Sequence, residues 1–173
     1  KKIIKGKKLL ITAGPTFEPI DPIRYIGNFS SGKQGYEIEK AASLYGAKTI
    51  LITGPSLENP PEVDILVKIQ TAQEMLKYTI NFCKKFKFID AAICTAAVSD
   101  WKIDKSKKKY KKSENIFKKI KFKENEDILK SISNLKNFRD LSFNFFSVPN
   151  NFFLCLMCSH GARNFCTKKS NKF

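Results

Sequence analysis

The fold is decided by the stretch Leu9-Leu10-Ile11-Thr12-Ala13-Gly14-Pro15 and by its later counterpart, Ile50-Leu51-Ile52-Thr53-Gly54-Pro55. Each is a short apolar run that stops at Gly-Pro, which is typical of a strand buried on both faces and therefore of a parallel sheet. Apolar residues at helical spacing lie between the two runs: Ile38, Ala41, Ala42 and Tyr45. Gly46 follows, where a helix commonly ends. The pattern predicts a strand–helix–strand unit.

The alternation of strands and helices continues to residue 95. Residues 65–69 and 89–95 predict two further strands, and the helix between them begins with a capping box formed by Thr71 and Glu74. The apolar face of this helix comprises Ala72, Met75, Leu76, Thr79, Ile80 and Cys83. Strands that alternate with helices of this length predict an α/β fold with a Rossmann-like open parallel sheet and helices on both faces.

The sequence changes character at Trp101. Lysines crowd residues 101–123, where alternation is weak, and this predicts a mobile loop followed by an irregular strand. Asn125 then has the position of an N-cap, and it predicts a short helix. The side chains expected to face inward from that helix are Ile128, Ile132 and Leu135.

No period of 2 or 3.6 organises the sequence beyond residue 137. Eight of the 15 phenylalanines and three of the five cysteines lie from Phe138 onward. We therefore expect one domain over residues 1–137 and an irregular, atypical tail of unknown structure over residues 138–173.

Composition limits the class of protein. A chain of 173 residues with 42% hydrophobic side chains can form one domain with a real core. The net charge of +16 suggests a nucleic acid or an anionic membrane as partner, but arginine, which base and phosphate recognition favours, occurs only three times. No apolar run reaches the roughly 18 residues of a membrane span. We expect a cytoplasmic protein with reduced cysteines, and the missing initiator methionine suggests a piece of a longer chain.

Ligands of open α/β sheets bind beyond the carboxyl ends of the strands, where this sequence has unusual residues. Gly14 ends the first strand, and Ser30-Ser31-Gly32 precedes a helix whose N–H groups could bind phosphate, although a plain cap and turn explains the same residues. Ala96-Ala97-Val98-Ser99-Asp100 offers close backbone approach and a carboxylate for a ribose or a metal-bound water, or it is simply a tight strand end. The loop around Lys109 is a third candidate, or a solvated face.

Six motifs resemble successive signatures of the phosphopantothenate–cysteine ligase family: ITAGPT (11–16), DPIRYI (21–26), NFSSGK (28–33), AAVSDW (96–101), KYKK (109–112) and NEDI (125–128). The resemblance covers roughly residues 5–137 in the order and spacing of the family. In bacteria this ligase is usually the C-terminal half of a bifunctional coenzyme A biosynthesis protein, behind a flavin-dependent decarboxylase. Any FMN would therefore belong to the decarboxylase half.

The resemblance implies that the protein ligates 4'-phosphopantothenate to cysteine with CTP and Mg²⁺, through an acyl-cytidylate intermediate. It also implies a homodimer whose two active sites share elements of both chains. Asn28 would bind the acyl group or its oxyanion, and Arg24 would orient a phosphate. The remaining residues implied in nucleotide binding are Gly14, Ser30, Ser31, Gly32, Ala96, Ala97, Asp100, Lys109, Asn125, Asp127 and Ile128. No residue is expected to hold a metal by itself.

The sequence departs from the family at two points. Glu126 replaces the proline usual there, and nothing from Phe138 onward resembles the family's final motifs. The alternative is therefore a catalytically defective fragment of the ligase, and a preference for ATP over CTP also stays open.

Other functions also remain as alternatives. Cys155, Cys158, His160 and Cys166 could form a zinc site of unusual spacing, and the lysine loop could bind nucleic acid. A dinucleotide enzyme fits the fold, but the glycine fingerprint is missing.

Overall fold

The computed structural model describes residues 3–85, 89–111, 120–133 and 135, together with the backbone of residues 142–148 and 152–158. Its centre is a six-stranded sheet in the order β5-β4-β1-β6-β10-β9. The four parallel strands are β1 (Lys8–Ala13), β4 (Lys48–Thr53), β5 (Ile65–Lys68) and β6 (Ala91–Cys94). The predicted parallel α/β sheet is confirmed.

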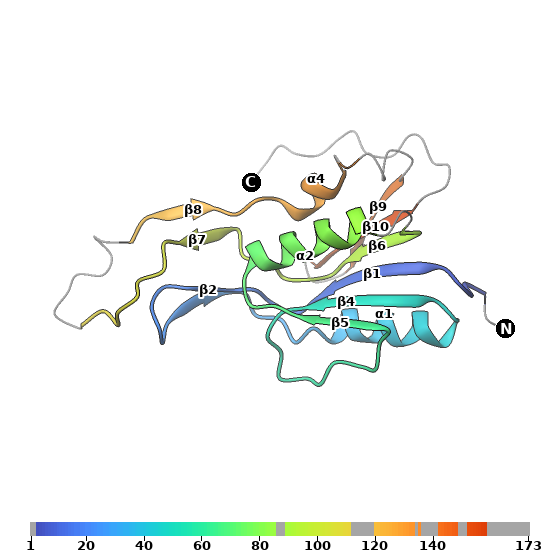
Figure 1. Ribbon diagram of the computed structural model, residues 1–173, viewed down its shortest axis with the longest axis horizontal. Coiled ribbons are helices and arrows are strands. Elements are labelled where there is room, and N and C mark those ends of the chain that lie inside the picture. Colours follow the sequence, from blue (N-terminus) through green and yellow to red (C-terminus); the bar gives the residue numbers. More distant parts are fainter. Residues whose placement is uncertain are drawn as a thin grey trace.

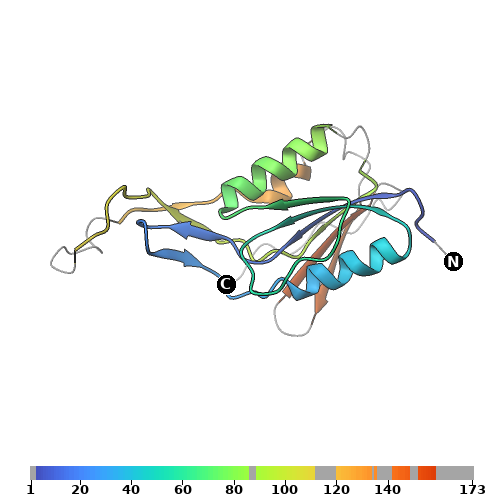
Figure 2. The same ribbon diagram turned by 60° about the horizontal axis from the view of Figure 1, so that its bottom comes forward.

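Helices cover both faces of this sheet (Figures 1 and 2). Helix α1 (Lys33–Leu44) lies on one face, whereas α2 (Ala72–Lys85) and the short α4 (Ile128–Ser133) lie together on the other. In the described part of the chain, no helix is long and apolar enough to cross a membrane.

The alternation along β1 divides its side chains between the two faces. Leu10 faces α2 and α4 within a large apolar cluster, and Leu9, Ile11 and Ala13 face α1. The buried face of α1 consists of Gly35, Tyr36, Glu39 and Ala42. The apolar spacing in the sequence finds this helix but not its buried face, since Ala41 is exposed and Tyr45 is 46% exposed.

Two helix starts were predicted from capping residues, with different outcomes. The capping box of α2 is confirmed, because Glu74 N–H donates to Thr71 Oγ1 at 3.2 Å and Thr71 N–H donates to Glu74 Oε2 at 3.2 Å. The assignment of Asn125 as the cap of α4 is wrong. Asp127 has that role, since its Oδ1 accepts from Lys130 N–H at 3.0 Å.

Two small antiparallel pairs extend from the carboxyl edge of the sheet (Figure 1). One pairs β2 (Phe17–Pro19) with β3 (Tyr25–Gly27), and the other pairs β7 (Trp101–Ile103) with β8 (Phe122–Glu124). Strands β2 and β7 contact each other, so the two pairs form one projection, which we call the arm. The predicted irregular strand is β8, but the predicted mobile loop begins wrongly at Trp101, because residues 101–103 form strand β7 and pair with β8. Residues 112–119 lie outside the described residues.

The tail was expected to be irregular, but the described backbone contains two strands. Strands β9 (Ser142–Val148) and β10 (Phe152–Cys158) form a hairpin that pairs antiparallel with β6. Strand β10 is apolar at every position, so the alternation that identifies a strand is absent from its sequence. The side chains of the proposed zinc ligands Cys155, Cys158, His160 and Cys166 lie outside the described residues.

Candidate functional site

The ends of β1 and β6 are joined beyond the sheet itself. Ala97 N–H donates to Gly14 O at 2.9 Å, and Thr16 N–H donates to Ala97 O at 3.2 Å. Ser99 N–H then donates to the buried hydroxyl of Thr16 at 2.9 Å. Two of the three loops predicted to bind ligand therefore lie side by side, because parallel neighbours end at the same edge of a sheet.

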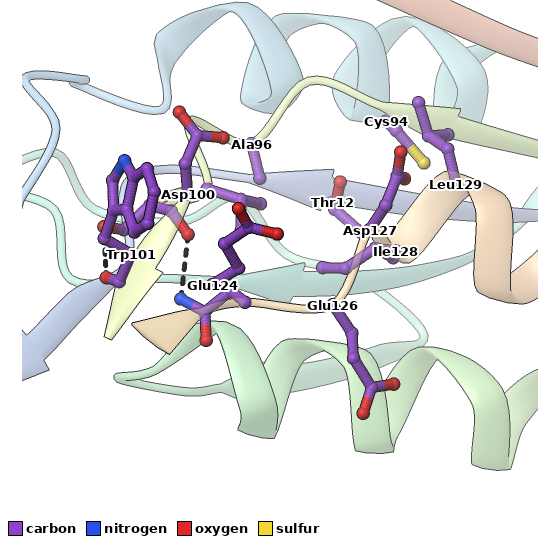
Figure 3. A pocket seen from close by; sticks show the side chains of 13 residues that line it. Thr12, Cys94, Ala96, Asp100, Trp101, Glu124, Glu126, Asp127, Ile128 and Leu129 are labelled. Carbon is purple, nitrogen blue, oxygen red and sulfur yellow. Dashed lines mark hydrogen bonds between the residues drawn. The ribbon is translucent and has the colours of Figure 1, made fainter. Parts of the chain in front are cut away.

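A cavity of about 570 Å³ opens at this edge, on the face that carries α4 (Figure 3). It is lined by Thr12, Cys94, Ala96, Val98, Ser99, Asp100, Trp101, Glu124, Asn125, Glu126, Asp127, Ile128 and Leu129. Five predicted residues are among them: Ala96, Asp100, Asn125, Asp127 and Ile128. The structure thus brings together two motifs that lie about 25 residues apart in the sequence.

Asn125 joins the two walls of the cavity. Its side-chain Nδ2 donates to Ser99 O at 2.8 Å, and its backbone N–H donates to Asp100 O at 2.8 Å. An asparagine side chain can make this bond across a loop because it carries both donor and acceptor groups. Asn125 therefore holds the start of α4 against the end of β6, which fixes the width of the cavity.

The lining is acidic. Its charged side chains are all carboxylates (Asp100, Glu124, Glu126 and Asp127), and none of the lining residues is a lysine or an arginine. In Figure 3 the side chain of Glu126 points away from the other three, so the departure from the family's proline does not add charge to the interior. The described residues contain no group of three or more acidic, histidine or cysteine ligands placed for a metal ion.

Asn28 lies beside the cavity, not in its lining. Its Nδ2 donates to the carbonyl of Val98 at 2.9 Å, and Val98 is a lining residue. One N–H of the amide is used in this bond, which leaves the second N–H and the oxygen for a ligand.

The first turn of α1 lies against Gly14. Gly32 precedes the helix with φ 74°, a left-handed conformation that glycine adopts without strain, and its Cβ position is 3.3 Å from Gly14 Cα. The hydroxyls of Ser30 and Ser31 accept from the N–H groups of Gly32 and Lys33 at 3.3 and 3.4 Å. The helix has no side-chain N-cap bond, so its next N–H groups remain for an anion.

Arg24 and Lys109 do not line the cavity. Both belong to the arm, where Arg24 NH1 lies 3.3 Å from Asp21 Oδ2 and Arg24 NH2 donates to Tyr110 O at 3.5 Å. Burial by itself raises the pKa of Asp21. Backbone N–H bonds from Ile23, Tyr110 and Arg24, together with the charge of Arg24, outweigh that effect and lower its pKa below the usual value. Asp21 is therefore ionised at neutral pH.

Four residues that shape the site have no predicted role. Thr12 and Cys94 line the cavity from the sheet, and the alternation along β1 and β6 could have placed them on that face. Glu124 lines it from the end of β8, and although weak alternation predicts that strand, nothing in the sequence marks Glu124 itself. Asp21 is only part of a motif in the sequence, whereas in the structure it is 2% exposed and accepts a hydrogen bond from Tyr110 N–H.

Comparison with known proteins gives the same family for most of the chain. The sequence model of the family named DNA/pantothenate metabolism flavoprotein C-terminal domain matches residues 4–148. The match ends eleven residues beyond residue 137, where the resemblance of the motifs ends. A coenzyme A biosynthesis bifunctional protein CoaBC from Borreliella burgdorferi is 43% identical over 139 residues, which are 79% of this chain and 34% of that protein. The protein of the same description from Vibrio parahaemolyticus is 40% identical over 152 residues, 86% of this chain and 37% of that protein.

A solved structure shares the fold. The crystal structure of the C-terminal domain of coenzyme A biosynthesis bifunctional protein CoaBC has 38% sequence identity and a TM-score of 0.66, and it covers 79% of this chain and 62% of that chain. The chain spans a little over a third of the length of the bifunctional relatives it matches. It belongs to the family of the DNA/pantothenate metabolism flavoprotein C-terminal domain.

Proposed function

We propose that this chain acts in coenzyme A biosynthesis as a phosphopantothenate–cysteine ligase that uses CTP. The observation that carries the proposal is the cavity, because two of the six family motifs form its opposite walls and Asn125 ties them together. The relatives with the same domain are named coenzyme A biosynthesis bifunctional proteins, and they support the pathway.

The cavity suits the nucleoside part of the nucleotide. Asp100 can accept hydrogen bonds from ribose hydroxyls, and the small side chain of Ala96 allows the ligand to approach the backbone. The carboxylates of Asp100, Glu124 and Asp127 would repel a bare triphosphate, so the phosphates must lie outside the cavity or carry a cation.

The residues fit Mg²⁺ that arrives with the nucleotide. This ion usually keeps several waters and binds one or two carboxylates plus substrate phosphates, and Asp100 and Glu124 are the lining acids available for that purpose. When bound, Mg²⁺ would neutralise phosphate charge.

The proposed reaction has two steps. The carboxylate of 4'-phosphopantothenate attacks the α-phosphorus of CTP, an oxygen–phosphorus bond forms, and pyrophosphate leaves. The amine of cysteine then attacks the acyl carbon of the cytidylate, loses a proton and displaces CMP to form the amide. The free N–H of Asn28 donates to the acyl oxygen as its charge increases, because the side chain is already held at the cavity wall by Val98 O.

Two further groups bind phosphate in this proposal. The start of α1, next to Gly14 and Ser31, offers backbone N–H groups to the phosphate of one substrate. Arg24 and Lys109 on the arm would bind the triphosphate. Because neither residue lines the cavity of its own chain, we propose a homodimer in which the arm reaches a shared site, with the decarboxylase half fused or associated.

The test is a reaction with 4'-phosphopantothenate, Mg²⁺ and either CTP or ATP, followed by mass spectrometry. We expect pyrophosphate and an acyl-cytidylate before cysteine is added, and the amide with CMP afterwards. Wild-type protein that releases no pyrophosphate with either nucleotide would contradict the proposal, and faster release with ATP would contradict the choice of CTP.

An Asn28→Asp variant distinguishes catalysis from folding. A carboxylate at this position would repel the acyl oxyanion, so turnover should fall at least 10-fold while the melting temperature changes little. Asn59→Asp is the matched control, since residue 59 is an exposed loop position outside the cavity. An Asn28→Asp variant that unfolds would assign Asn28 a structural role.

A further inference from the structure

Asp21 is a buried carboxylate at the base of the arm. Only 2% of its surface is exposed, although it lies between two prolines in a turn. Its side chain contacts groups from two segments that are almost 90 residues apart: the turn 21–24 and Tyr110 in the lysine-rich segment. A buried charge is costly unless it is fully bonded, so this position calls for an explanation.

The two carboxylate oxygens have different partners. Oδ1 accepts from the N–H groups of Ile23 and Arg24, each at 2.9 Å, and forms a local turn. Oδ2 accepts from Tyr110 N–H at 3.3 Å and lies 3.3 Å from Arg24 NH1. Arg24 NH2 in turn donates to Tyr110 O at 3.5 Å, which closes a ring of three residues.

The contact brings two cationic residues to the same part of the arm. Arg24 belongs to the ring itself, and Lys109 is the residue before Tyr110. The same segment is held once more by Ser106 N–H, which donates to Ile20 O at 2.9 Å. Within the described residues, Lys109 has no ion-pair partner, whereas Asp21 is fully engaged by Arg24 and backbone N–H groups. The exposed side chain of Lys109 is accessible to an external anion.

We infer that Asp21 is a positioning residue, which holds Arg24 and residues 105–110 together as one binding element for the nucleotide triphosphate. The inference rests on the proposed function for the identity of the anion. Asp21 itself would not contact the nucleotide, because its oxygens are occupied by the turn, by Tyr110 and by Arg24.

A carboxylate is required because every partner of this side chain is a donor. Aspartate accepts at both oxygens, whereas asparagine accepts at only one and carries N–H donors at the other. An Asp21→Asn variant can keep the turn through Oδ1, but it places an NH₂ group against Tyr110 N–H and the Arg24 guanidinium. The substitution therefore breaks the distant half of the contact and leaves the local half intact.

The experiment compares Asp21→Asn with a matched control, Asp104→Asn. Asp104 also lies on the arm and makes an ion pair, with Lys123 Nζ at 2.7 Å, but it is exposed and has no contact with Arg24 or Tyr110. For Asp21→Asn we expect a rise of about 10-fold in the KM for the nucleotide triphosphate, with the KM for cysteine unchanged. We expect no change in either constant for Asp104→Asn.

A second measurement does not depend on catalysis. Trypsin should cleave after lysines 105–111 several-fold faster in Asp21→Asn than in the wild type or in Asp104→Asn, because loss of the Tyr110 contact frees the segment. Inorganic pyrophosphate should slow this cleavage in the wild type and much less in the variant. If Asp21→Asn does not fold, Tyr110→Pro removes the distant N–H donor without changing the turn, and cleavage is then followed after Lys105, Lys107 and Lys108, because trypsin does not cut before proline.

The outcomes separate this inference from the proposed function. Unchanged cleavage and an unchanged triphosphate KM in Asp21→Asn would overturn the positioning role. An equal rise in the KM for every substrate, together with a lowered melting temperature, would show that Asp21 only stabilises the fold. If the wild-type protein releases no pyrophosphate from the nucleotide, the proposed function is overturned. The role of Asp21 would then be decided by the rate of tryptic cleavage and by the protection that added pyrophosphate gives against it.

Discussion

The two faces of the parallel sheet are packed in different ways, although the same strands form both. The face under α2 and α4 is an apolar cluster that includes Leu10, Ile52, Met75 and Ile132, all fully buried. The face under α1 combines small residues with buried polar groups: Gly35, Tyr36, Glu39, Thr49 and Thr53.

The difference shows how the site is built. The α2 face is largely apolar and holds α4, whose start forms one wall of the cavity. On the α1 face, glycine allows the helix to lie very close to β1, which brings the first turn of the helix to the strand ends. We expect substitutions on the two faces to change the free energy of unfolding by different amounts and for different reasons.

The largest effect is expected from Met75→Ala on the apolar face. Met75 is fully buried, and its removal should lower the free energy of unfolding by about 2–5 kcal/mol, because apolar contacts are lost and a cavity remains. Chemical denaturation measures the change. Lys77→Ala, on the solvent side of the same helix, is the control, and a loss under about 1 kcal/mol for Met75→Ala would contradict the importance of this face.

Gly35→Ala tests the close approach of α1. A Cβ at this position would lie 2.5 Å from Ala13 Cβ and 2.6 Å from Thr95 Oγ1. Alanine gains about 1 kcal/mol in helix propensity, but overpacking costs about 1–3 kcal/mol, and we expect a net loss because Ala13 lies on a central strand. In the proposed function, binding of the substrate phosphate at the start of α1 should also weaken as the helix moves away. Gln34→Ala, exposed on the same turn, should be neutral or stabilising.

Tyr36→Phe tests the polar contacts of the α1 face. The Tyr36 hydroxyl lies 2.8 Å from Thr53 Oγ1, and Thr53 Oγ1 can donate onward to Gly54 O at 3.2 Å. Loss of this buried hydroxyl should cost about 1 kcal/mol. The half-exposed Tyr45 provides the control variant Tyr45→Phe, for which thermal unfolding should be unchanged. Equal values for the two variants would mean that the buried hydroxyl pair contributes nothing.

The smallest effect is expected from Glu39→Gln. Glu39 Oε1 accepts from Ser43 Oγ at 2.6 Å and from Thr49 Oγ1 at 2.8 Å, whereas Oε2 has no partner in the described part of the chain. Glutamine keeps the acceptor at Oε1 and is neutral at every pH, so stability should stay within about 1 kcal/mol of the wild type or increase. Glu37→Gln loses an exposed ion pair with Lys40 and should lower the free energy of unfolding only slightly. A large loss for Glu39→Gln would indicate that the charge itself is needed.

Much of the fold could be predicted from the sequence, and less of the site. Local sequence predicts the strands β1 and β4, the helix α2 and its capping box. The apolar runs, the helical spacing and the capping residues each lie within one short segment, so no distant contact is needed to recognise them. The cavity could be anticipated only in part, since Ala96, Asp100 and Asn125 were predicted site residues while Thr12, Cys94 and Glu124 were not. The predicted role of Asn125 as a helix cap was wrong, because its side chain bonds to Ser99 O across the cavity wall.

The sequence by itself determined the fold class, the order of the elements and the family, because these depend on spacing between near neighbours and on short motifs. Only the tertiary structure decided which side chains face one another across long separations. The bond from Asn28 to Val98 and the bond from Tyr110 to Asp21 join residues 70 and 89 positions apart. No local pattern encodes such pairs, because they form only when the sheet has brought the strand ends to one edge.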